Sequence, residues 1–142
     1  MNRIPVVALV LLSFIVLFRA VPVAYGYNQQ DLDQLKRTKQ CSACDLSNAP
    51  LANTNLTKAN LERANLFTAN LSGANMAGAN MAGANCMNAT LSGASLVNTD
   101  LRNANLTGAN MSGANLFDAN LSLAVWTDGT ICKEGSIGTC KK

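Results

Sequence analysis

The stretch A-N-L-S-G-A-N-M-A-G-A-N-M-A-G at residues 69–83 repeats one five-residue pattern three times. In both directions from it, every fifth residue from Leu46 to Ile131 is apolar, and the phase never changes over eighteen positions. The residue two places before each of these positions is alanine, with four exceptions. The exceptions are Cys44, Thr54, Thr99 and Gly129. The pattern A-N-L-x-x therefore organises most of the chain.

A period of five residues excludes an amphipathic helix and a flat strand. Five helical steps of ~100° rotate each apolar side chain by ~140° from the previous one, so no stripe forms. A strand alternates with period two, so an odd repeat would send successive leucines to opposite faces. The apolar residues share one interior only if the chain turns a corner in every repeat. Asn and Asp, together with glycines such as Gly73 and Gly78, favour such corners.

The repeat therefore predicts a coil that winds around its leucines. The alanine two residues before each leucine would also point inward, where close packing leaves no room for a larger side chain. Backbone N–H and C=O groups would pair between successive coils at about 4.8 Å, as between neighbouring strands. Such a solenoid is stabilised mainly by stacking of neighbouring coils.

These residues resemble the pentapeptide-repeat proteins, whose consensus is A-D/N-L-x-x. The resemblance covers residues 44–133 and implies an all-β, right-handed, four-sided β-helix with four repeats per coil. Residues 27–43 are predicted to cap the first coil, with a short amphipathic helix from Asp31 to Gln40 that carries Leu32 and Leu35. Residues 134–142 are predicted to form a C-terminal cap and tail.

The N-terminal residues predict export. An apolar run over residues 4–18 follows Arg3, and small residues precede Tyr27, which is typical of a signal peptide over residues 1–26. The alternative is a membrane anchor through residues 4–18 that faces the same compartment, although a span needs about 20 apolar residues. After cleavage we expect no membrane association.

Composition argues against catalysis and against nucleic-acid binding. The chain has no histidine, the commonest general base and zinc ligand, and no phosphate-binding glycine motif. Between residues 46 and 131 the only basic residues are Lys58, Arg63 and Arg102, too few for a basic patch. We therefore expect a non-enzymatic protein without a metal or other cofactor and without a nucleic-acid partner.

The five cysteines predict two disulfides and one buried thiol. Cys86 replaces a core leucine and lies midway along the repeats, so we expect it to be free and inert. Cys132 and Cys140 flank a loop with two glycines and are predicted to pair. Cys41 and Cys44 both fall in the inward phase, which favours a structural disulfide. The alternative is a redox-active dithiol in the C-x-x-C motif.

The outward positions predict a possible partner surface. If one coil takes 20 residues, Phe67 stacks on Met87, and on the opposite face Val97 stacks on Ala77 and below Phe117. These apolar strips are either structural ladders or a surface for an unknown protein partner. Trp126 is predicted to pack the end of the solenoid in preference to stacking on a ligand.

Together these features favour an exported structural or protein-interaction scaffold in the periplasm or the thylakoid lumen. Two alternatives remain beside it. One is a thiol-disulfide protein that uses Cys41 and Cys44. The other is suggested by relatives that mimic DNA and inhibit a topoisomerase, although those relatives are strongly acidic rods and this chain is nearly neutral after export. The sequence leaves the partner and the oligomeric state open.

Overall fold

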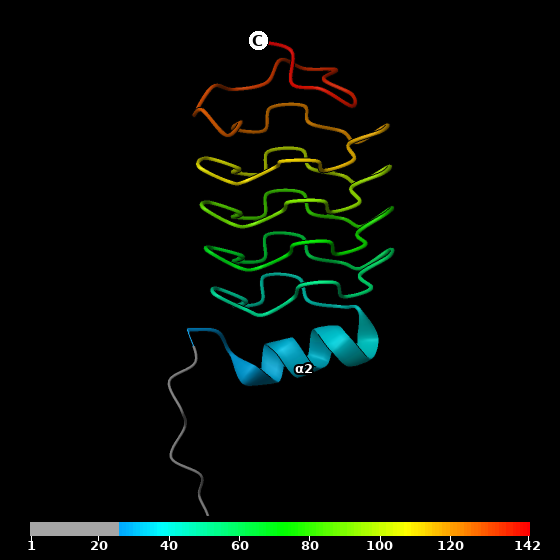
Figure 1. The fold of residues 1–142 in the computed structure, drawn as a ribbon, viewed down its shortest axis with the longest axis vertical. Coiled ribbons are helices and arrows are strands. Elements are labelled where there is room, and N and C mark those ends of the chain that lie inside the picture. Colours follow the sequence, from blue (N-terminus) through cyan, green and yellow to red (C-terminus); the bar gives the residue numbers. More distant parts are fainter. Residues whose placement is uncertain (1–25) are drawn as a thin grey trace, which may run out of the picture.

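The computed structural model describes residues 26–142, and they form a rod of stacked coils with one helix across its N-terminal end (Figure 1). The helix, α2, spans Gln29–Thr38. The remaining secondary structure consists of isolated β-bridges that start at Gln40. The predicted signal segment, apart from Gly26, lies outside the described residues.

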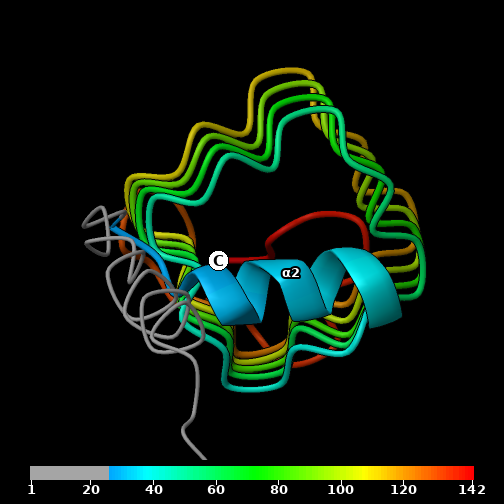
Figure 2. The ribbon, with the colours of Figure 1, turned by 90° about the horizontal axis from the view of Figure 1, so that it is seen from below.

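Each coil takes 20 residues. Fourteen parallel bridges join residue i to residue i+20, from Gln40–Asn60 to Asn105–Val125, so residues 20 apart stack directly, as predicted. Seen along the rod, the coils superimpose around a common interior (Figure 2). The predicted all-β class needs one refinement, because among the described residues no bridge extends into a longer strand. The corner in every repeat interrupts the extended backbone after each bridged residue.

The corner has the same backbone conformation in successive repeats. From Leu46 to Leu121, the residue two places after each apolar position has a positive φ, whether it is a glycine such as Gly78 (φ 68°) or a residue such as Asn98 (φ 54°). A backbone bond closes the turn, as from Ala79 N to Met76 O at 2.9 Å. The preceding asparagine also contributes, because Asn75 Oδ1 accepts a hydrogen bond from Ala77 N at 3.1 Å. Asparagine thus supplies the local bond that stabilises the corner.

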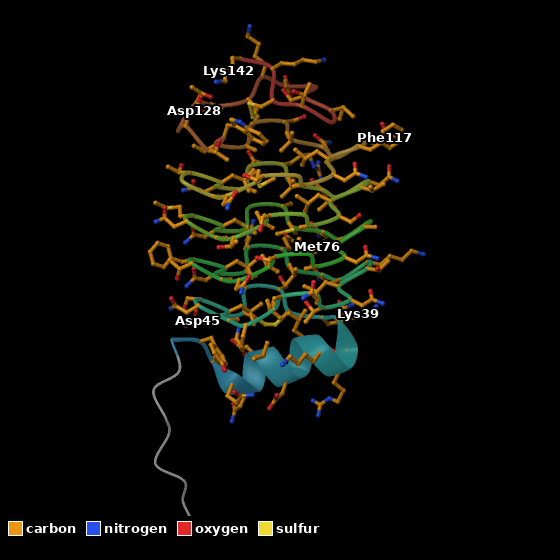
Figure 3. All side chains as sticks on the ribbon, in the orientation of Figure 1. Lys39, Asp45, Met76, Phe117, Asp128 and Lys142 are labelled. Atoms are coloured by element: carbon orange, nitrogen blue, oxygen red, sulfur yellow. A yellow bond between two sulfur atoms is a disulfide. The ribbon has the colours of Figure 1, made fainter. Side chains whose placement is uncertain are left out.

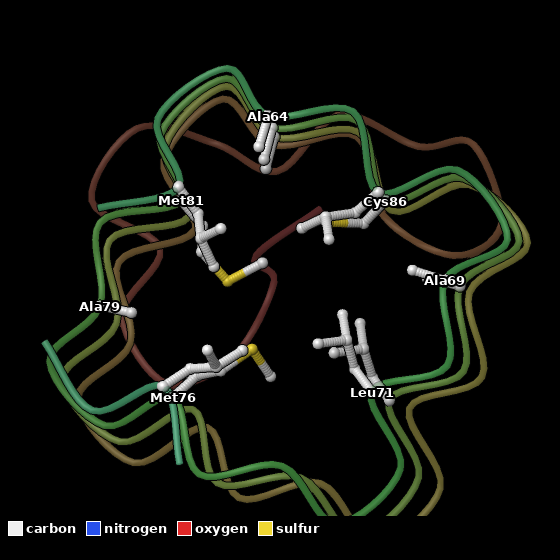
Figure 4. Packing of buried hydrophobic residues seen from close by; sticks show 14 of the residues in the cluster. Ala64, Ala69, Leu71, Met76, Ala79, Met81 and Cys86 are labelled. Carbon is white, nitrogen blue, oxygen red and sulfur yellow. The ribbon is translucent and has the colours of Figure 1, made fainter. Parts of the chain in front are cut away.

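The interior is filled by the two inward positions of each repeat. Leu71, Met81 and Cys86 are fully buried, and so are Ala64 and Ala69. Figure 4 shows these side chains pointing toward the common axis. Thr99 replaces an alanine and is also buried, and its hydroxyl donates to Met76 O at 2.9 Å. The core therefore tolerates this polar group because the group is satisfied.

Helix α2 begins two residues before the predicted start and ends at Thr38. Asn28 caps it, because its side chain accepts from Gln30 N and Asp31 N, and Lys39 ends it in the left-handed conformation. Leu32 and Leu35 are buried against the first coil. Figure 2 shows α2 lying across the N-terminal opening.

The C-terminal repeats depart from the prediction. The chain reverses after Asp128 and pairs antiparallel with the last coil through Val125–Ile131 and Asn120–Ile137. Ile131 was predicted to point inward, but this prediction is wrong, since it is 64% exposed. The reversal shifts the inward phase, so Cys132 and Ser136 are buried instead. Trp126 is half-buried and packs against the core cluster at this end.

Candidate interaction surfaces

The two predicted apolar ladders lie on outward positions of consecutive coils. Phe67 is 38% exposed and Met87 is half-buried in the coil that follows. On the opposite side Val97 is half-buried, and Phe117, one coil further on, is 65% exposed. Figure 3 shows Phe117 projecting away from the rod near its C-terminal end. The structure therefore brings these residues together in pairs, with Phe117 the most accessible of them.

The cysteines lie at the two ends and in the middle of the rod. Cys41 and Cys44 are bonded, with an S–S distance of 2.08 Å and a Cα–Cα distance of 5.2 Å. Cys132 and Cys140 are bonded at 2.05 Å. Cys86 is a free, buried thiol, and burial raises its pKa to about 12. A thiol with that pKa stays protonated at neutral pH and is a poor nucleophile or metal ligand.

The N-terminal disulfide is enclosed. Cys41 is fully buried and Cys44 is 7% exposed, and Leu32 and Leu35 of α2 belong to the same buried cluster. Redox exchange requires a thiolate to reach one of the two sulfurs. The burial of this pair therefore favours a structural role over the alternative of a redox-active dithiol.

Charged side chains are few and mostly exposed. Glu62, Arg63, Ala82, Gly83, Arg102 and Asn103 line a surface depression. It forms where Ala82 and Gly83 present little bulk between two coils. Arg102 forms an ion pair there with Asp100, and Arg102 Nη2 lies 2.6 Å from Asp100 Oδ2. This hydrogen bond holds the pKa of Asp100 below its ordinary value. Apart from its shape, the depression has no feature that points to a ligand.

The described residues offer no metal site or membrane span. Within residues 26–142, no three His, Cys, Asp or Glu side chains are grouped as metal ligands would be. No helix in this range has both the length and the apolarity needed to cross a bilayer.

Comparison with protein families agrees with this geometry. Eight copies of the family model "Pentapeptide repeats" match residues 44–83 and 84–122. The chain belongs to the pentapeptide-repeat family. Pentapeptide-repeat proteins fold as right-handed β-helices and are generally structural and not enzymatic. A comparison with curated protein sequences returns no significant match.

Several solved structures of pentapeptide-repeat proteins are similar. One, from the Arabidopsis thaliana thylakoid lumen, has 33% sequence identity and a TM-score of 0.55, and the match covers 67% of this chain and 59% of that one. HetL, from the cyanobacterium Nostoc, is involved in heterocyst differentiation regulation. It has 34% identity and a TM-score of 0.37, and the match covers 65% of this chain and 51% of HetL. Another Nostoc protein has 31% identity and a TM-score of 0.38, and the match covers 77% of this chain and 88% of that one. The matched region thus spans little more than half of the first two relatives.

The sequence missed three features at the ends of the rod. Ser136 is buried and Asp31 Oδ2 accepts a hydrogen bond from Asp45 N at 2.8 Å, but neither residue lies in the repeat. The third feature is an unpaired backbone edge over residues 109–118, described below. The only sequence signal of an irregular C-terminal end is that the repeat stops after Ile131.

Proposed function

We propose that this protein is an exported, non-catalytic scaffold whose lateral apolar ladders bind a protein partner in the periplasm or the thylakoid lumen. The observation that carries the proposal is Phe117, 65% exposed on an outward repeat position. A large aromatic side chain that is mostly exposed contributes little to the core of the fold, whereas aromatic side chains are enriched in protein interfaces. The proposal takes the coil to be the right-handed, four-sided form, with Phe67 and Phe117 on opposite sides.

Export is supported by the two disulfides and by one relative. Disulfides persist in oxidising compartments and are rare where thiols are kept reduced, and four of the five cysteines here are paired. The Arabidopsis relative with a TM-score of 0.55 comes from the thylakoid lumen. The proposal therefore includes a cleaved signal peptide over residues 1–26.

Cross-linking in the native compartment tests this function. A photo-reactive cross-linker is placed at Ser122 in chains that carry Phe67→Ser, Phe117→Ser or neither change. Thr107→Ala is the matched control, because Thr107 lies one coil beyond Met87 on the same outward position. We expect Phe117→Ser to lose a discrete cross-linked product and Thr107→Ala to retain it. A product that persists in both phenylalanine variants contradicts the lateral surface.

Cell fractionation tests the compartment separately. We expect the chain in the soluble exported fraction, shortened by 26 residues. A full-length chain that stays with the membranes would instead favour the anchor through residues 4–18.

A further inference from the structure

The backbone groups along one edge of each coil follow a fixed pattern. The N–H of the apolar residue and the N–H two residues on both donate to the next coil, as from Leu96 N to Asn115 O at 2.7 Å and from Asn98 N to Phe117 O at 2.9 Å. The carbonyl of the inward alanine accepts in return, as Ala94 O does from Asn115 N at 2.9 Å. Each repeat therefore presents two donors and one acceptor toward the C-terminal end.

The C-terminal cap satisfies this pattern on part of the last coil. Leu121 N donates to Ser136 O at 2.8 Å, and Leu123 N donates to Cys132 O at 3.1 Å. In return, Ala119 O accepts from Gly138 N at 2.8 Å. The inward residues of the cap, Cys132 and Ser136, are small and buried over the core. An antiparallel, extended segment is thus a suitable partner for this edge.

The adjoining two repeats of the same edge make no hydrogen bonds of this kind, although Gly138 at the end of the cap lies beside Leu116 and Asp118. Within residues 26–142 no hydrogen-bond partner meets the N–H groups of Met111, Gly113, Leu116 and Asp118, or the carbonyls of Ala109 and Ala114. Met111, Ala114 and Leu116 are only half-buried, whereas the equivalent side chains of the preceding coil, Leu91, Ala94 and Leu96, are fully buried. This segment, residues 109–118, is called the open edge below.

We infer that the open edge binds an extended peptide segment of a partner protein, which adds to the last coil antiparallel and continues the pairing that the cap begins. The inference rests on the proposed scaffold function and names a second surface for it. Peptides commonly add to exposed sheet edges in this way. By analogy with Cys132 and Ser136, the peptide residues that face the core would be small.

A second copy of this chain does not fit the open edge. Two open edges placed against each other would bring together twice as many donors as acceptors. The acceptor-rich end of the rod is the N-terminal one, and α2 covers it with Leu32 and Leu35. An extended segment from another protein meets neither obstacle.

Hydrogen exchange with a defined peptide tests the inference. The probe is a synthetic nine-residue peptide that copies residues 130–138 with serine in place of Cys132. It is added to the exported protein with both disulfides intact, and amide exchange is followed by mass spectrometry with residue-level fragmentation. We expect exchange at Met111, Gly113, Leu116 and Asp118 to slow at least tenfold at saturating peptide, which equals about 1.4 kcal/mol of protection.

An N-methylated peptide and a series of protein concentrations without peptide serve as controls. The same peptide with N-methyl groups at the two donor positions, equivalent to Cys132 and Gly138, should protect much less. Unchanged exchange at the open edge, or protection confined to residues 119–126, overturns the inference. Protection that appears on concentrating the protein without peptide also overturns it, in favour of self-association. Loss of the lateral cross-link with Phe67→Ser is a separate readout, because Phe67 lies about two coils away from the open edge, so the scaffold and the open edge can fail independently.

Discussion

At the scale of single residues, the coil depends on two recurring side chains, an inward alanine and the asparagine that follows it. Alanine is needed at the inward position because the corner brings the backbone close to the interior, and Ala84 is fully buried there. Asparagine is favoured before the apolar residue because its carbonyl oxygen accepts a hydrogen bond from the N–H two residues on, as Asn70 does from Ser72 N at 3.1 Å. The positive φ that follows is adopted by Asn, Lys, Arg and Thr as well as by glycine.

Replacing Ala84 by leucine should be far more damaging than replacing Ser72 by leucine. Overpacking a filled interior costs about 1 to 3 kcal/mol, whereas surface substitutions usually change stability by less than about 0.5 kcal/mol. Ser72 lies on an outward position, and its hydroxyl bonds only Asn70 and Ser92. Urea denaturation of both variants measures the difference. Equal losses of stability would refute the inward assignment of alanine.

Asp100→Asn should reduce the dependence of stability on pH. Asparagine occupies the equivalent position in neighbouring coils, at Asn80 and Asn120, so the backbone is preserved. The hydrogen bond from Arg102 holds the pKa of Asp100 below 3.8. The carboxylate therefore stabilises the fold above about pH 4, and this contribution is lost as pH falls through the lowered pKa.

The expected size of this effect is small. Asp100 and Arg102 are partly exposed, and exposed ion pairs contribute about 0 to 1 kcal/mol. Denaturation of the wild type and the variant at about pH 7 and about pH 2.5 should show a difference that shrinks at the lower pH. A difference that stays constant or grows on acidification contradicts the assignment.

At the scale of elements, the two ends of the rod are closed by different means. Helix α2 buries Leu32 and Leu35 on the first coil, and Pro50 on the adjoining edge has no N–H to leave unpaired. The C-terminal end is closed only over residues 119–126, by a returning segment that the Cys132–Cys140 disulfide links. Ends need such cover because an open coil exposes apolar interior and unpaired backbone.

Replacing Cys132 and Cys140 by serine should loosen the C-terminal cap and leave the rest of the rod folded. The bond closes a loop of nine residues. On the entropic model this raises the free energy of the unfolded state by about 2.5 kcal/mol. Hydrogen exchange should therefore accelerate at Leu121 and Leu123, whose amides donate to the cap.

The matched control is the double serine variant of Cys41 and Cys44. It should leave exchange at Leu121 unchanged, because stacking couples mainly neighbouring coils. Faster exchange at the C-terminal end in this control, or none in the Cys132 and Cys140 variant, contradicts the local role of each disulfide. Peptide mapping of unreduced protein, with a single free thiol at Cys86, would check the pairing itself.

At the scale of the whole molecule, the rod behaves as a stack with a 20-residue period. Deleting residues 67–86 removes one complete coil and joins Leu66 to Met87 in the original phase. We expect this shortened chain to fold, with a denaturant m-value lower by about a sixth, since m scales with the surface exposed on unfolding.

Deleting residues 67–84 is the matched control. It removes only two residues fewer but shifts every later leucine out of the inward phase. We expect it to lose the circular-dichroism spectrum of the parent and its cooperative unfolding. If both deletions fold equally well, the 20-residue period does not determine the stacking.

Of the two candidate surfaces, the sequence predicts the apolar ladders but not the open edge. The outward stacking of Phe67 on Met87, and of Val97 below Phe117, follows from the period once the coil length is known. The open edge could not be inferred, because its N–H groups belong to repeats that resemble all the others. They lack partners only because the chain turns back after Asp128 and covers other residues.

The sequence by itself determined the interior of the rod. A five-residue period admits one packing in which leucine and alanine share an interior, and side-chain volume enforces it locally in every repeat, as at Leu71 and Ala84. The tertiary structure alone decided the ends. At Ile131 the repeat still reads as inward, yet with no following coil to pair with, the backbone gains more hydrogen bonds by reversing onto Val125. That choice depends on what lies beyond the repeat, so Ile131 is exposed and Cys132 is buried in its place.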